Sequence, residues 1–235
     1  MEVKYNIEKI IKSKYFKVAV AIYAAIFVYN AALTLIYPER YRAGANYTNK
    51  FKLEADAGED GINPIMFKDK NLERVIRIYL GKDQGIIFAK DVRGITELDL
   101  RYQGITTLID LRYFKGLKKI NVAYNEISSL EGLTNLPKLE ELIAFENNIS
   151  DIKGIGNVKT LKKLDLANNN ITDVSEISSL KNLEILNLSS NRIQNILGFE
   201  KLINLKEIDV SQNNIKDFSA VEKLKVKLLL DWGNK

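Results

Sequence analysis

The sequence predicts an α/β solenoid, a fold that stacks one structural unit many times. The main observation is a repeat of 22 residues, because stepping by 22 from Ile95 reaches a leucine every time, at Leu117, Leu139, Leu161, Leu183 and Leu205. Seven columns of this repeat are apolar in all six units, so that all 42 positions are apolar in a chain that is 46% hydrophobic. A period of roughly 20–50 residues is the sequence signature of a solenoid, in which each unit buries its core only against its neighbours.

Each unit begins with a short predicted strand. Leucines alternate with single polar residues, as in Leu164-Asp-Leu166 and Leu186-Asn-Leu188. Successive side chains of a strand point to opposite faces, so the leucines face the core and the residues between them face outward. The strands should form a parallel sheet, and the later apolar columns of each unit should complete the core from the opposite wall.

The ninth column of the repeat is amide-bearing in every unit, as Gln103, Asn125, Asn147, Asn169, Asn191 and Asn213. An asparagine at the turn that follows a strand can pair backbone N–H and C=O groups of adjacent coils that would otherwise be buried without partners. We therefore predict a structural ladder here. Gln103 departs from the pattern, which fits a first repeat whose outer neighbour is a cap.

The full pattern, L-x-x-L-x-L-x-x-N-x-I-x-x-I-x-x-L-x-x-L, resembles leucine-rich-repeat proteins of the 22-residue, internalin-like bacterial class. The resemblance covers the six repeats and the segment before them, where Asp69–Glu73 and Ile95–Leu100 match the usual cap helix and first strand. It implies a horseshoe with short parallel strands on its concave face. It also implies a binding module that holds another protein on that face.

The segment before the first repeat is predicted to be a helical cap. Asp69 is a suitable N-cap, Gly81 a suitable stop, and one helical face between them is apolar, with Leu72, Val75, Ile76, Tyr79 and Leu80. At the other end, Leu230 and Trp232 should occupy the fourth and sixth columns of a closing half-strand. The predicted organisation is a basic flank (1–17), a transmembrane helix (18–37), a linker (38–60), the cap (61–94), six repeats (95–226) and a C-terminal half-strand (227–235).

The segment Val18–Tyr37 is predicted to cross a membrane. Its first 19 residues carry no charge, enough to cross most of a hydrocarbon core of about 30 Å. We expect a retained signal anchor. The alternative is a cleaved signal peptide, for which Ala43-Gly44-Ala45 resembles a cleavage site. Lysines before the segment slightly favour a cytoplasmic N-terminus, with the solenoid on the extracytoplasmic side.

One side of this predicted helix is suited to packing against other membrane helices. Small residues and a single amide, which promote such contacts, occur at Ala21, Ala25, Asn30 and Ala32. They predict contact with other membrane subunits. The alternative is a lone anchor that tolerates these residues.

The candidate partner-binding residues lie at outward positions of the strands. Tyr102, Tyr124, Ile143 and Phe145 should form one exposed patch on repeats one to three, with Arg101 at its edge and Ile185 farther along. Tyr and Arg dominate many binding interfaces, and an exposed apolar cluster usually marks a contact. Alternatively, Ile143 and Phe145 simply pack on neighbouring strands or lie under the linker.

The sequence offers no candidate for catalysis, metal or cofactor binding. Cys and His are absent, which excludes disulfides, thiol nucleophiles, imidazole bases and the usual zinc sites. Asp99, Asp165 and Asp209 share an outward column but stand on repeats one, four and six, too far apart for paired carboxylate chemistry. The net charge of +5 includes residues that flank the membrane segment, and charges alternate along the strands, so no nucleic-acid partner is expected.

These observations together predict a membrane-anchored protein-binding module of the surface receptor or adhesion type, and not an enzyme. Two alternatives remain open. The chain could be a constitutive subunit of a membrane complex, or a cytoplasmic scaffold tethered to the membrane.

Overall fold

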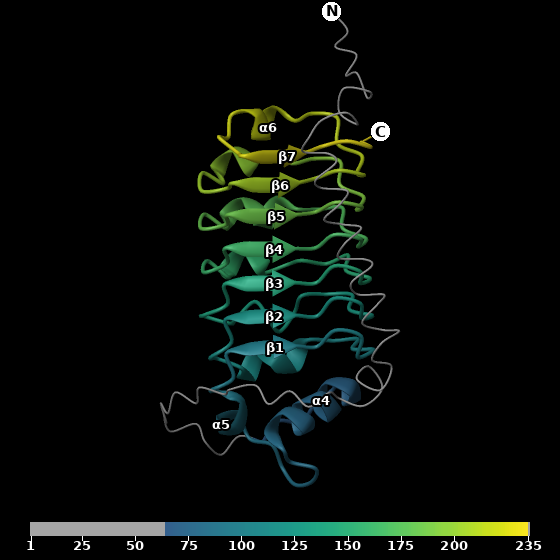
Figure 1. Ribbon diagram of the computed structural model, residues 1–235, viewed down its shortest axis with the longest axis vertical. Coiled ribbons are helices and arrows are strands. Elements are labelled where there is room, and N and C mark those ends of the chain that lie inside the picture. Colours follow the sequence, from purple (N-terminus) through teal and green to yellow (C-terminus); the bar gives the residue numbers. More distant parts are fainter. Residues whose placement is uncertain (1–63, 235) are drawn as a thin grey trace, which may run out of the picture. The chain divides into compact units, whose positions relative to one another are not determined.

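The computed structural model describes residues 64–234, which contain one parallel sheet of seven short strands stacked in chain order (Figure 1). Strands β1 to β6 are separated by 22 residues, so that Leu142, for example, lies opposite Leu164. The predicted solenoid and its parallel sheet are confirmed. The strands are β1 (Glu97–Asp99), β2 (Lys119–Asn121), β3 (Glu141–Ile143), β4 (Lys163–Asp165), β5 (Ile185–Asn187), β6 (Glu207–Asp209) and β7 (Leu228–Leu230).

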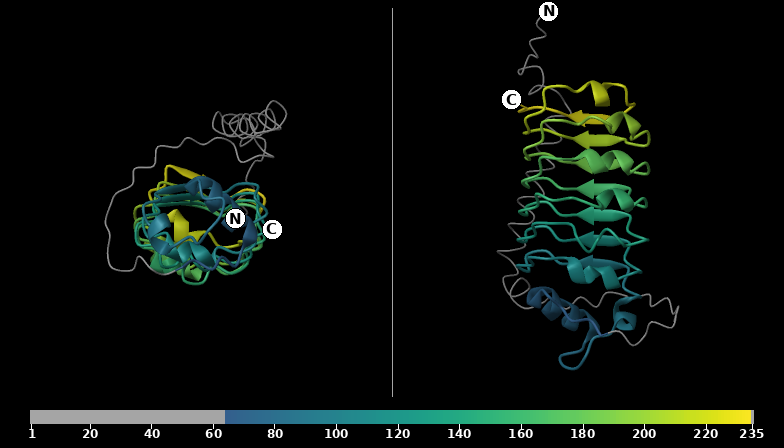
Figure 2. Two further views of the ribbon diagram at one scale, coloured as in Figure 1. Left: turned by 90° about the horizontal axis from the view of Figure 1, so that it is seen from below. Right: turned by 180° about the vertical axis from the view of Figure 1, so that it is seen from behind.

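Short helices connect most of the strands, and the coils superimpose when seen from one end (Figure 2). All seven apolar columns are buried in repeats one to five. In repeat six, Phe218 and Leu224 are only partly buried, beside the short coil that carries β7. The connecting helices are the 3-10 helices η1 (Ile109–Tyr113), η2 (Ile155–Asn157), η3 (Ser175–Ser179) and η4 (Phe199–Lys201), and the α-helix α6 (Ser219–Glu222).

The predicted asparagine ladder is confirmed. The Asn147 side-chain amide donates to the carbonyl oxygens of Val122, Ala144 and Phe145, at 3.0, 3.2 and 3.3 Å. Its oxygen accepts the backbone N–H of Ile127 at 3.0 Å. Each ladder residue thus bonds both its own coil and the preceding one, which pairs backbone groups that have no partner within a single coil. The arrangement recurs at Asn125, Asn169, Asn191 and Asn213.

The cap begins with helix α4 (Lys70–Leu80), which has the predicted limits. One Asp69 carboxylate oxygen accepts the N–H of Leu72 at 2.9 Å, and Gly81 ends the helix with φ 62°. The second oxygen of Asp69 accepts the N–H of Thr106 at 2.7 Å, which ties the cap to the first repeat. Burial raises the pKa of Asp69, but these hydrogen bonds outweigh burial and hold the pKa below its usual value. A second short helix, α5 (Ala89–Val92), leads into β1.

The register of the last strand differs from the prediction by one residue. Ile208 lies opposite Leu229, a step of 21 residues, because the sixth repeat is one residue shorter than the others. The core-facing position therefore belongs to Leu229 rather than Leu230, and Trp232 is 45% exposed. The ladder nevertheless continues, because Asn234 accepts the N–H of Ile215 at 2.9 Å and donates to the Val210 carbonyl at 3.0 Å.

The predicted flank (1–17), transmembrane helix (18–37) and linker (38–60) lie outside the described residues. Between residues 64 and 234, none of the helices combines the length and the apolar character that are needed to cross a bilayer. The membrane segment stays a prediction.

Replacing Asn147 by Ala should lower the free energy of unfolding by about 3 kcal/mol, because it leaves several buried backbone groups unpaired, at roughly 1–3 kcal/mol for each such group. Chemical denaturation would measure the loss. The matched control is Asn148→Ala, since Asn148 is the exposed neighbour of Asn147. Equal stability of the two variants would contradict the role assigned to the ladder.

Candidate protein-binding face

The outward side of the sheet, which we call the strand face, carries a row of three aromatic side chains across repeats one to three. The rings of Tyr102 and Tyr124 are stacked, with centroids 4.3 Å apart and an interplanar angle of 9°. Phe145 meets Tyr124 edge-on at 4.9 Å and 79°. Tyr102 is 41% exposed, while the other two are partly buried. These three residues form the aromatic ladder, and the sequence predicted all of them as parts of one patch.

The two tyrosines stand at a corner where the backbone adopts the left-handed conformation. Their φ values are 58° and 57°, and the same position has positive φ in the other repeats, at Glu146, Asn168, Ser190 and Gln212. This conformation is uncommon for residues other than glycine, and asparagine tolerates it better than most. The sequence analysis did not predict this left-handed backbone conformation. The available signal was that this column contains no β-branched residue in any repeat.

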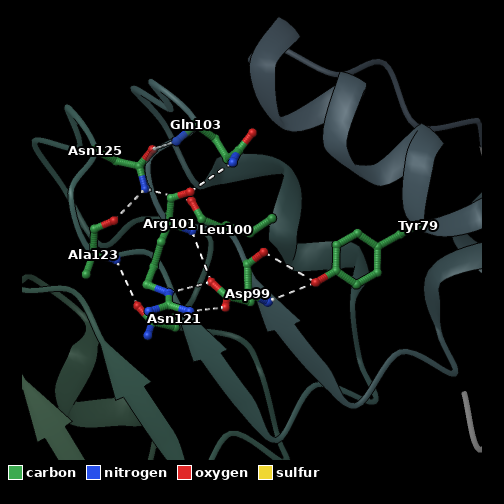
Figure 3. Close-up of polar contacts among 8 residues, drawn as sticks. All are labelled: Tyr79, Asp99, Leu100, Arg101, Gln103, Asn121, Ala123 and Asn125. Carbon is green, nitrogen blue, oxygen red and sulfur yellow. Dashed lines mark hydrogen bonds and ion pairs between the residues drawn. The ribbon is translucent and has the colours of Figure 1, made fainter. Parts of the chain in front are cut away.

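The other predicted contact residues are less closely associated with the aromatic ladder. Arg101 is held by Asp99, with Nη2 2.7 Å and Nε 2.9 Å from the carboxylate (Figure 3). Ile143 is partly buried in β3, the strand that leads to Phe145. Ile185 lies in another outward column, paired with Lys163 of β4. It therefore stands apart from the predicted patch.

The cap also reaches the outer edge of β1, through Tyr79 of α4 (Figure 3). The Tyr79 hydroxyl accepts the N–H of Asp99 at 3.1 Å and donates to the Asp99 carbonyl oxygen at 3.3 Å. It thus pairs the outer edge of β1. Gln103 accepts a hydrogen bond from Arg74 of the cap at 3.0 Å, which explains why the first repeat departs from asparagine. The sequence placed Tyr79 on the packing face of the cap, but gave no sign of this edge contact.

One outward column is polar throughout repeats four to six. Asp165, Asn187 and Asp209 occupy one column of consecutive strands. The Asp165 carboxylate accepts the N–H of Ala167 at 3.1 Å, but burial, with a smaller contribution from the nearby charge of Asp209, raises its pKa to about 6. Burial also raises the pKa of Asp209. The two carboxylates lie two strands apart, about 9.6 Å by strand spacing, with Asn187 between them.

Charges beside these columns alternate in sign and pair across strands. Lys163 lies 2.9 Å from Glu141, and Lys162 lies 2.6 Å from Glu140. Such exposed pairs contribute roughly 0–1 kcal/mol each. Because these charges pair, the flank of the strand face is close to neutral. The first half of the strand face therefore differs from the second half in its apolar and aromatic side chains.

Comparison with known proteins agrees with this geometry. Residues 137–179, 159–201 and 181–225 match the family model described as Leucine Rich repeats (2 copies). Internalin C2 of Listeria monocytogenes is similar in structure, with 29% sequence identity and a TM-score of 0.68, over 76% of this chain and 81% of that one. The described chain is a leucine-rich-repeat solenoid that resembles this internalin in structure. Proteins of this kind are typically modules for protein interaction.

Two further structures share the fold of this internalin-like solenoid. Another internalin of Listeria monocytogenes, InlF, is 22% identical with a TM-score of 0.59, over 74% of this chain and 59% of that one. A leucine-rich-repeat protein of Leptospira interrogans is 24% identical with a TM-score of 0.53, over 62% of this chain and 50% of that one. No curated protein sequence matches the chain.

Replacing Asp165 by Asn should stabilise the solenoid at pH 7.5 and change little near pH 4. The pKa of Asp165 is about 6 in the folded state, against an ordinary value of 3.8, so folding favours the protonated form. The stability that Asp165 contributes is complete below pH 3.8 and is lost as the pH rises through 6. Asn removes this loss, and we expect a gain of about 1–2 kcal/mol at pH 7.5. Thermal melting at both pH values would measure it.

The control for this experiment is Asp173→Asn, which should act in the opposite direction. Asp173 is exposed, and its hydrogen bond from the N–H of Ser175 lowers its pKa. Its contribution is therefore present at pH 7.5 and lost in acid, so Asn should lower the melting temperature slightly at pH 7.5. A gain at pH 7.5 for both variants would point to a general charge effect instead.

Proposed function

We propose that this chain is a membrane-anchored binding module that holds another protein against its strand face, with the aromatic ladder as the centre of the contact. The observation that carries the proposal is the continuous contact of Tyr102, Tyr124 and Phe145 across three repeats. The internalin-like leucine-rich-repeat fold supports the general class, a protein-binding module.

Folding alone gives no reason for tyrosine at the corner after the strand. The left-handed backbone there suits asparagine better, and repeat four has Asn168 at this position. Repeats five and six have Ser190 and Gln212, so the corner forms without an aromatic ring. Tyrosine is less favourable than asparagine in the left-handed conformation, and these tyrosines are partly exposed. Contact with a partner is the best explanation for their presence.

The aromatic ladder is also arranged in a way that favours tight contact. Stacking of Tyr124 between Tyr102 and Phe145 restricts its rotation before any partner arrives. Less side-chain entropy is then lost on binding, where an ordered side chain costs about 0.5–1.5 kcal/mol. Aromatic rings combine a large contact area with few rotatable bonds, which is why they are enriched where binding energy is concentrated.

The membrane anchor and the side of the membrane are further parts of the proposal. The uncharged stretch within 18–37 supports anchoring, and the lysines before it favour an extracytoplasmic solenoid. Such a module would act as a surface receptor or adhesion protein. Packing residues Ala21, Ala25, Asn30 and Ala32 would add contacts with other membrane subunits if the chain belongs to a permanent complex.

The double variant Tyr124→Asn, Phe145→Ala should abolish partner capture while the solenoid remains folded. It gives repeats two and three residue types that repeat four already uses at these positions, Asn168 and Ala167. Loss of two central aromatic contacts should weaken binding by at least tenfold, since hot-spot residues contribute about 2 kcal/mol or more each. Affinity purification of the tagged chain after mild solubilisation, with quantitative identification of the proteins captured, would measure the change.

The matched control for capture is Ser190→Asn, which alters the same corner in repeat five. It should leave capture unchanged, and its melting temperature would show that the solenoid is folded. If the double variant captured the same proteins in the same amounts, the aromatic ladder would be excluded as the binding site. Recovery of a fixed-stoichiometry set of membrane proteins with every variant would favour the constitutive subunit instead.

Protease treatment of intact cells should remove the solenoid if it lies outside the membrane. Immunoblotting with an antibody against the repeats would follow the loss, and a cytoplasmic protein would serve as a control for cell integrity. Full protection of the repeats in cells with an accessible surface would place them in the cytoplasm. The chain would then be a tethered scaffold.

A further inference from the structure

The two ends of the sheet differ in how their backbone groups are paired. At β1 the Tyr79 hydroxyl bonds both the N–H and the carbonyl oxygen of Asp99. At β7, Leu228 donates its N–H to Lys206, and the Leu230 carbonyl accepts the N–H of Val210, so both residues face β6. Alternate residues of a strand present their N–H and C=O groups to opposite edges, so Leu229 presents both of its groups to the outer edge.

No hydrogen bond within residues 64–234 reaches the outer-edge groups of β7. These groups are the N–H and C=O of Leu229, the C=O of Lys227 and the N–H of Asp231. A strand edge of this kind is a template for pairing with another chain.

The side chains of β7 are also unlike those of the other strands. The preceding strand places Glu207, Asp209 and Ser211 on the strand face, whereas the corresponding residues of the last coil are Leu228, Leu230 and Trp232. Leu228 is 38% exposed and Trp232 is 45% exposed. The partial exposure of Phe218 and Leu224 in the adjoining coil adds to this apolar end. Burial of these groups would complete both the core and the sheet.

We propose that β7 pairs antiparallel with β7 of a second copy of this chain, about a two-fold axis that passes through Leu229. In this register the N–H and C=O of Leu229 exchange two hydrogen bonds with the partner subunit's Leu229. The N–H of Asp231 donates to the carbonyl oxygen of the partner's Lys227, and the symmetric bond forms as well. All the free edge groups are then paired, and the two sheets become one.

The side chains fit the same register. Leu228 lies opposite the partner's Leu230 on the strand face, which brings apolar groups together. Lys227 lies opposite the partner's Asp231, so the charges are complementary. Lysines at a strand edge normally oppose pairing, and this match removes that obstacle for Lys227. A sequence that matches itself when reversed about Leu229 favours a second copy over an unrelated strand, because a two-fold interface brings the same patch of both subunits together.

Cysteine cross-linking of the full-length chain tests the register, since the chain has no cysteine of its own. Opposed residues of an antiparallel pair that do not exchange hydrogen bonds have Cα atoms about 4.5 Å apart, within the range that a disulfide spans. A mixture of the single variants Leu228→Cys and Leu230→Cys should therefore form a disulfide-linked dimer under mild oxidation. Each variant alone should cross-link at least tenfold less, because identical residues are offset diagonally by about 7–8 Å.

Charge variants supply a second measurement that does not depend on the leucines. In sedimentation analysis after mild solubilisation, Lys227→Asp should weaken dimerisation at least tenfold, and the double variant Lys227→Asp, Asp231→Lys should restore it. Asn148→Cys, on an exposed residue far along the chain from β7, is the control for random cross-linking. Melting temperatures of all variants would show that the solenoid is intact.

Three results would overturn the proposal. The first is a monomer at every concentration of the unaltered chain. The second is equal cross-linking of Leu228→Cys alone and of the mixture. The third is a dimer that persists unchanged in Lys227→Asp, which would place the contact elsewhere, for example in the predicted membrane segment. Partner capture by the aromatic ladder is unaffected by any of these outcomes.

Discussion

The structure depends on how the chain pairs its backbone groups where each coil leaves the sheet. At that corner the backbone turns away from the strand, and several N–H and C=O groups are buried between two coils. The side chain of Asn147 pairs them by donating to both coils and accepting from one. An amide is suited to this task because it is both donor and acceptor on a short stem. The left-handed residue immediately before it, Glu146, completes the same corner.

Because the ladder and the apolar columns hold the coils, the outward positions are free to vary. Repeats one to three carry aromatic rings at outward positions. Repeats four to six carry Asp165, Asn187 and Asp209 there, and the last coil carries leucine and tryptophan. All three regions rest on the same backbone. The fold therefore does not require the differences along the strand face.

The two ends of the sheet differ from its middle because their strands have a neighbour on one side only. A parallel stack always leaves one unpaired edge at each end. At the first end, Tyr79 closes the edge and Asp69 joins the cap to the first repeat through the backbone of Thr106. At the last described strand, apolar side chains and free backbone groups coincide. That combination makes this end suited to association.

The sequence by itself determined the solenoid, the sheet, the cap helix and the asparagine ladder. Each of these repeats a local pattern, and a pattern repeated six times leaves little room for another fold. The ring contacts of Tyr102, Tyr124 and Phe145 were also foreseen, because they follow from strand spacing alone.

Only the tertiary structure decided the features that depend on a single contact. The one-residue shift at β7 was missed because a shortened coil lets Leu229, Leu230 or Trp232 be aligned with the core, and only pairing with β6 chooses among them. The edge contact of Tyr79 joins residues 20 apart, and nothing in the repeat encodes it. The raised pKa of Asp165 likewise comes from burial among neighbouring strands. Such properties arise between coils, and a one-dimensional pattern does not contain them.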